Sequence, residues 1–139
     1  MAKKEIILIS GKFRAGIQPN HLTLFETARY YKSLYDNAVI VVAMNNDVSL
    51  KKLKQHIIYT ENDRLEMAMS IKDVDAVMLF EDINPASLCE TIRPTILIKG
   101  HDWTDVSDAD IPEFPHVELM VFAPQKKKYH TSQTFKDGK

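Results

Sequence analysis

The sequence is poor in cysteine and glycine, and it contains no long apolar run. Cys89 is the single cysteine, which excludes an internal disulfide and fits a reducing compartment. The apolar run near the N-terminus is only four residues long, too short for a signal peptide or a membrane span. We therefore expect a cytoplasmic protein without a membrane partner.

Signatures of several common binding sites are also missing. The sequence has no G-x-x-x-x-G-K-[ST], so a P-loop NTPase is unsupported, and no G-x-G-x-x-G, which argues against a dinucleotide oxidoreductase. Its histidines and cysteine match no recognised zinc spacing, so we expect no protein-held metal site. The net charge of −1 provides no global field for binding nucleic acid.

What remains is the composition of an ordinary globular domain. A length of 139 residues suits a single domain, 1–139, and 45% of the residues are hydrophobic. Five short apolar runs are continuous rather than alternating, which is typical of parallel strands buried on both faces. These predicted strands are 5–10, 38–43, 75–80, 95–99 and 117–122.

Segments with helical period lie between the apolar runs, at 21–35, 61–73 and 84–93. Thr60 with Asp63 suits one helix start, and Asn84 with Pro85 suits another as N-cap and first helical residue. Strands that alternate with helices form βαβ units with right-handed crossovers. The sequence therefore predicts an α/β fold, a three-layer αβα domain with a five-stranded parallel sheet.

Cations, hydroxyls and glycines follow the predicted strands. In such sheets, ligands bind beyond the carboxyl ends of the strands, near the switch point in strand order. Lysines offset the charge of a polyphosphate, and backbone N–H groups at helix starts donate to its oxygens. The residues in these segments are Gly11, Lys12, Arg14, His21, Asn46, Asp47, Lys52, Lys54, Lys99, Gly100, Asp102, Lys126–Lys128, His130, Thr131 and Ser132.

Motifs in order along residues 5–135 then resemble a known family. They are "ISGKF", "HLTLFETARYY", "VAMNNDVSLKKLK", "ENDRLEMAMSIKDVDAVMLFED", "RPTILIKGHDW" and "YHTSQ". Together they resemble the cytidylyltransferase-like nucleotidyltransferases, especially the heptose-1-phosphate adenylyltransferase and glycerol-3-phosphate cytidylyltransferase types. The resemblance implies a Rossmann-like fold, an NTP substrate (ATP or CTP) with Mg²⁺, a phosphorylated sugar or polyol as acceptor, pyrophosphate release and a possible homodimer.

The loop of that family reads G-x-F-D-x-x-H-x-G-H, and its second histidine matches His21. Gln18 stands in place of the first histidine, Asn20 in place of the glycine and Arg14 in place of the aspartate. The resemblance implies catalytic roles for His21, Gln18 and Lys54. It implies ligand contacts for Gly11, Lys12, Phe13, Arg14, Asn46, Asp47, Lys52, Lys99, Gly100, Asp102, Trp103, His130, Thr131 and Ser132.

Other interpretations stay open beside an active enzyme. The chain could bind a nucleotide or phosphorylated ligand without catalysis, as a regulatory or scaffolding module, because the loop departs from the family pattern. It could also be a flavodoxin-like interaction module with no nucleotide site. Locally, His21 could simply cap a helix, and Lys52 and Lys54 could lie on a solvated helix face. We expect Arg64 to form an ion pair and Cys89 to lie in the core.

Overall fold

The computed structural model describes residues 3–82, 85–100 and 117–123, and within them five parallel strands form one sheet. The strands are β1 (Glu5–Gly11), β2 (Ala38–Asn45), β3 (Ala76–Phe80), β4 (Ile96–Lys99) and β5 (Leu119–Phe122). Their order across the sheet is β3-β2-β1-β4-β5, and every neighbouring pair is parallel. The predicted parallel sheet and all five predicted strands are confirmed.

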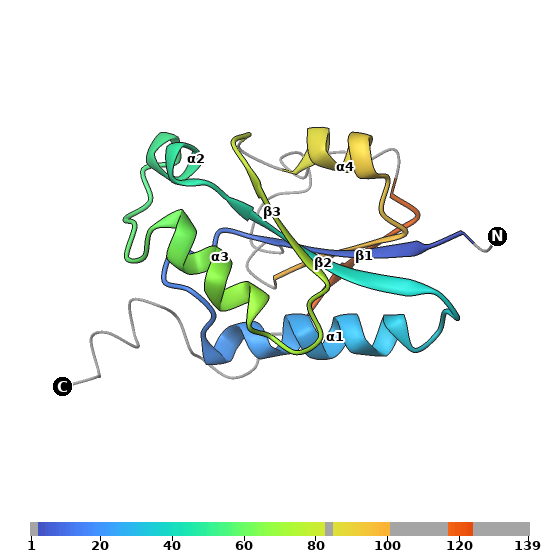
Figure 1. Ribbon diagram of the computed structural model, residues 1–139. Coiled ribbons are helices and arrows are strands. Elements are labelled where there is room, and N and C mark those ends of the chain that lie inside the picture. The colour runs from blue at the N-terminus through green and yellow to red at the C-terminus, as the bar shows by residue number, and fades with distance from the viewer. Residues whose placement is uncertain (1–2, 83–84, 101–116, 124–139) are drawn as a thin grey trace.

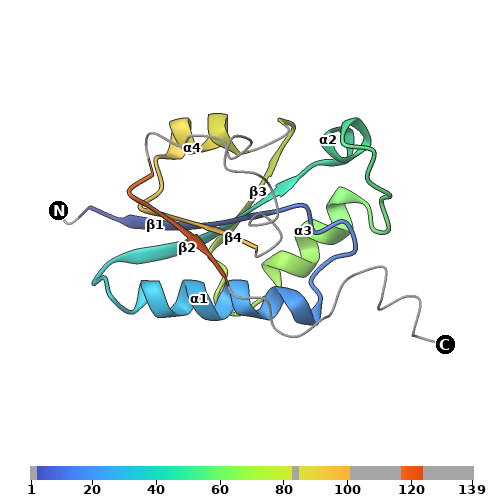
Figure 2. The same ribbon diagram turned by 180° about the vertical axis from the view of Figure 1, so that it is seen from behind.

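Helices cover both faces of this sheet. They are α1 (Leu22–Lys32), α2 (Asp47–Lys52), α3 (Glu61–Met69) and α4 (Ala86–Ile92), and a short 3₁₀ turn, η1 (Pro19–His21), precedes α1. Figure 1 shows α1 and α3 on one side of the sheet and α4 on the other. Seen from behind in Figure 2, β4 and β5 extend the sheet on the side of β1 away from β3. The three-layer αβα architecture is therefore also confirmed.

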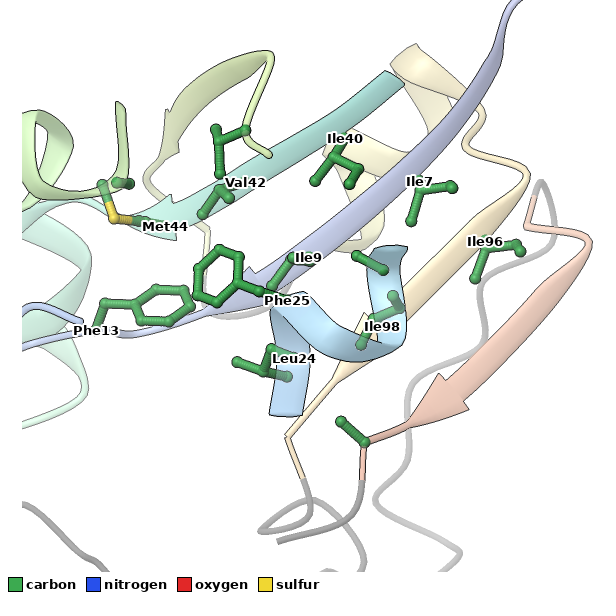
Figure 3. Close-up of a cluster of buried hydrophobic side chains, with 14 residues drawn as sticks. Ile7, Ile9, Phe13, Leu24, Phe25, Ile40, Val42, Met44, Ile96 and Ile98 are labelled. Carbon is green, nitrogen blue, oxygen red and sulfur yellow. The ribbon is translucent and has the colours of Figure 1, made fainter. Parts of the chain in front are cut away.

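Alternate residues of each strand pack into two hydrophobic cores, one on each face of the sheet. On β1, Ile7 and Ile9 join the cluster formed with α1 and α3, which Figure 3 shows, while Leu8 joins the cluster beneath α4. All three side chains are fully buried, which is why the strand reads as a continuous apolar run. Each such side chain contributes about 1.5–3 kcal/mol by leaving water. Cys89 of α4 lies in the second core, as expected.

Local signals set the helix ends with small departures from the expectations. Thr60 is the N-cap of α3 and accepts a hydrogen bond from the Asp63 N–H. Pro85 is the N-cap of α4, so the helix begins one position later than expected, and Asn84 lies outside the described residues. The helix α3 ends at Met69 rather than residue 73, because the Ile71 N–H bonds to the Ala68 carbonyl, three residues back, and the α-helical pattern stops there.

Candidate functional site

The strand order places a switch point between β1 and β4. From β1 the chain runs to β2 and β3 on one side, and it returns to β4 on the other side of β1. Ligands of open α/β sheets bind beyond the carboxyl ends of the strands at such a point. There β1 leads through Gly11 into the loop before His21, and β4 ends at Lys99 and Gly100. Several predicted site residues thus meet at the same edge of the sheet.

His21 lies at the junction of η1 and α1, where two hydrogen bonds fix it. The Gln18 N–H donates to His21 Nδ1 at 2.9 Å, and the His21 N–H donates to the Gln18 carbonyl at 2.8 Å. In a neutral imidazole whose Nδ1 accepts a hydrogen bond, the proton lies on Nε2. The loop therefore prepares Nε2–H as a donor at the start of α1, where the backbone also favours anions.

Lys99 carries a buried amine at the switch point. Its side chain is 2% exposed, and Nζ donates to Ser10 Oγ at 3.3 Å. Burial lowers the pKa of Lys99 from its usual 10.5 to about 7, while the Cys89 thiol raises it and the Lys12 ammonium lowers it further. The last residue of β4 therefore carries an amine that an arriving anion would help to keep protonated.

Arg64 joins the loops behind this edge of the sheet and is fully buried. Its Nη1 donates to the Lys12 and Asn45 carbonyls at 3.0 and 2.8 Å, and its Nε donates to the Tyr59 carbonyl at 3.1 Å. Nη2 forms an ion pair with Asp47 at 2.8 Å. The expected ion pair of Arg64 is confirmed, and its wider effect is to hold the loops after β1 and β2 in place.

Asn46 and Asp47, both predicted to contact ligand, also have structural partners. Asn46 is the N-cap of α2, and its Oδ1 accepts from the Ser49 N–H at 2.8 Å. Asp47 receives the Arg64 ion pair, and its Oδ2 accepts from the Glu61 N–H at 3.2 Å. These contacts position the starts of α2 and α3, and a direct role of either residue in binding stays a prediction.

The predicted cations Lys52, Lys54 and Arg14 have separate local surroundings. Lys52 is exposed and pairs with Glu81 at 3.7 Å, and a contact of Lys52 with phosphate stays a prediction. Lys54 is also exposed and follows α2 in a left-handed conformation, with φ of 58°. Arg14 donates to the backbone carbonyl of His56 at 3.3 Å.

Ser10 contacts the predicted site residue Lys99, and the sequence-based prediction misses it. It precedes Gly11 and lies on the same face of the sheet as Lys99, two residues beyond Leu8. The parallel register of β1 and β4 is the signal that could have identified it, because it places Ser10 opposite the end of β4. Five other predicted residues lie outside the described part of the chain: Asp102, Trp103, His130, Thr131 and Ser132.

The described residues contain neither a candidate metal cluster nor a candidate membrane-spanning helix. Within residues 3–82, 85–100 and 117–123, no three histidine, cysteine or acidic side chains form a group that could hold a metal ion. In the same part of the chain, none of the helices is both long and apolar enough to cross a membrane.

The fold and the switch-point site define a Rossmann-like α/β protein, and comparisons with known proteins identify its family. The family model described as cytidylyltransferase-like matches residues 18–134. The chain is 30% identical to the bifunctional protein HldE of Aliarcobacter butzleri over 97% of its length, and 33% identical to that of Helicobacter pylori over 94%. This chain belongs to the cytidylyltransferase-like family.

The relatives also show the limits of this similarity. The chain spans only 28% and 27% of the lengths of these two HldE proteins. A solved structure, the lipopolysaccharide core biosynthesis protein from Thermoplasma volcanium, superposes with a TM-score of 0.69 at 20% identity. The match covers 88% of this chain and 98% of that one, and it supports the Rossmann-like fold.

Proposed function

We propose that this chain transfers a nucleotidyl group from ATP or CTP to a phosphorylated sugar or polyol and releases pyrophosphate. Membership of the cytidylyltransferase-like family supports this reaction class. The observation that carries the proposal is the hydrogen bond from the Gln18 N–H to His21 Nδ1. That bond leaves the proton of the imidazole on Nε2, at the start of α1, where a phosphate oxygen would accept it.

In the proposed reaction, a phosphate oxygen of the acceptor attacks the α-phosphorus of the NTP. The new P–O bond forms while the bond from the α-phosphorus to the bridging oxygen breaks, and pyrophosphate leaves with that electron pair. His21 Nε2–H donates to a phosphate oxygen as negative charge develops, and Lys12 and Lys99 offset the charge of the phosphates. An oriented donor of this kind is worth about 2.7–4 kcal/mol in the transition state.

Mg²⁺ belongs to the proposal as a partner of the nucleotide. This cation usually keeps several waters and binds through substrate phosphates with one or two carboxylates. The described residues offer no cluster of acidic, histidine or cysteine side chains for it. The contributions of the protein to the proposed reaction are therefore those of its side chains and backbone described above.

The test is release of pyrophosphate from ATP or CTP with Mg²⁺ and a panel of sugar and polyol phosphates. His21→Ala removes the donor, and we expect kcat to fall on the order of a hundredfold or more. His21→Gln keeps an N–H donor at similar reach and should retain part of the rate. His56→Ala is the matched control, because His56 is exposed and, within the described part of the chain, its hydrogen bond with Arg14 uses the backbone carbonyl rather than the imidazole.

The outcomes separate the proposed enzyme from a binding module. Pyrophosphate release that depends on His21 but not on His56 supports the transferase. Folded protein that binds ATP or CTP in calorimetry, yet releases no pyrophosphate with any acceptor, would show a family member that binds without catalysis. Equal rates for wild type and His21→Ala would remove His21 from the mechanism.

A further inference from the structure

Phe13 has an unusual backbone conformation two residues after the end of β1. Its φ is 50°, in the left-handed region that bulky side chains rarely adopt. A turn holds it there, since the Gly16 N–H donates to the Phe13 carbonyl at 2.8 Å and Gly16 is itself left-handed, with φ of 75°. Strained residues of this kind persist where the surrounding structure holds them, and they cluster at functional sites.

The left-handed backbone turns the Phe13 ring back over the end of β1. The side chain is 4% exposed, and it lies at the edge of the core cluster, beyond the end of the strand (Figure 3). A Cβ on Gly11 would lie 2.8 Å from Phe13 Cε2 and 3.1 Å from Cζ. Only glycine leaves room for the ring at that position, so the backbone of Gly11 supports the ring from one side.

On another side the Phe13 ring meets the imidazole of His21. The ring centroids are 4.7 Å apart and the planes cross at 67°, an edge-to-face contact. The same imidazole receives the Gln18 N–H at Nδ1. The ring contact restricts the tilt of the imidazole, and the hydrogen bond selects which nitrogen carries the proton.

We propose that Phe13 is a positioning residue that holds the His21 imidazole in the orientation in which Nδ1 accepts from Gln18 and Nε2 presents its proton. The strain at Phe13 and the missing side chain at Gly11 serve this purpose. The kinetic consequence rests on the proposed transferase function. The effect on the imidazole itself does not, because it can be measured in protein without substrate.

The first experiment is nitrogen NMR of protein labelled with ¹⁵N-histidine, with the His21 signals assigned by their loss in His21→Ala. Wild type should show His21 in a single tautomer, with unprotonated Nδ1 and protonated Nε2. In Phe13→Leu the ¹⁵N chemical shifts of Nδ1 and Nε2 should move towards each other, because the two tautomers mix. Phe80→Leu is the matched control, because Phe80 is a buried phenylalanine in the opposite core. The His21 signals of this variant should stay as in wild type.

The second experiment measures pyrophosphate release in the same variants. We expect kcat of Phe13→Leu to fall roughly tenfold or more, with the KM for nucleotide changed by less than about threefold, because orientation matters most in the transition state. Phe80→Leu should keep kcat within about twofold. A merely structural role for Phe13 would predict similar kcat values for the two variants and an unchanged tautomer.

Gly11→Ala tests the same arrangement from the other side of the ring. The added methyl group collides with the Phe13 ring, so Gly11→Ala alone should disturb the His21 signals as Phe13→Leu does. In a Phe13→Ala background the ring is gone, and Gly11→Ala should have little further effect. The inference is overturned if His21 keeps its single tautomer in both Phe13→Leu and Gly11→Ala. If the tautomer mixes as expected but no variant or wild type releases pyrophosphate, the positioning stands and the transferase proposal fails.

Discussion

Replacement of Arg64 by methionine should strongly destabilise the protein while leaving the volume of the core nearly unchanged. The guanidinium is fully buried and makes hydrogen bonds to the Lys12, Asn45 and Tyr59 carbonyls and an ion pair with Asp47. Arg64→Met removes every one of these donors at once. The three carbonyls then lose their partner in a place that water reaches poorly.

The size of the effect follows from these contacts. A buried acceptor left without a partner costs about 1–3 kcal/mol, and we take the lower value because the loops can relax. Asp47 is 26% exposed, so solvent reduces the cost of its lost partner to about 1 kcal/mol. Together the free energy of unfolding should fall by about 4 kcal/mol, a large part of the 5–15 kcal/mol typical of such domains.

Urea denaturation followed by circular dichroism measures this change, with an expected loss of about 15 °C in Tm as a second reading. Arg29→Met is the matched control, because Arg29 is 49% exposed and pairs with Asp73 at the surface. That variant should lose no more than about 1 kcal/mol. If Arg64→Met is as stable as Arg29→Met, the inferred role of the buried guanidinium is refuted.

Two further predictions concern the buried groups beneath α4. The pKa of Lys99 is lowered to about 7, so between pH 7 and its usual pKa of 10.5 the unfolded chain binds more protons than the folded one, and stability should rise with pH. Urea midpoints across this range should rise in wild type and change less in Lys99→Met. Parallel curves for the two proteins would contradict the lowered pKa. Burial raises the pKa of the Cys89 thiol to about 11. At pH 8 a disulfide reagent should therefore modify native protein at least about a hundredfold more slowly than urea-unfolded protein, and equal rates would show that the thiol is accessible.

The sheet could be predicted from the sequence because its signal is local. Continuous apolar runs such as residues 38–43 arise when both faces of a strand are covered. In this protein one core lies on each face of the sheet, so the strands are buried on both sides. The helix α2 gave no comparable signal. It has six residues, too few for a clear period, and its start depends on the Asn46 cap.

The site could be predicted only in part, because its geometry depends on contacts between distant segments. The position of His21 followed from the loop spacing before a helix. The burial of Arg64 did not, since its acceptors come from three separate stretches of chain, around residues 12, 45–47 and 59. The left-handed turn at Phe13 was also invisible, because its sequence neighbours Lys12 and Arg14 do not report that the ring folds back over Gly11.

The arrangement around Arg64 has a consequence for protein engineering. Because residues 12, 45, 47 and 59 share a single guanidinium, the segments that carry them behave as one exchangeable unit rather than as separate grafts. Transplanting the loop after β1 alone into another Rossmann-like scaffold would leave its backbone without this common anchor. A chimera that imports α3 together with the loop after β1 and the junction of β2 and α2 would keep all the partners of the guanidinium.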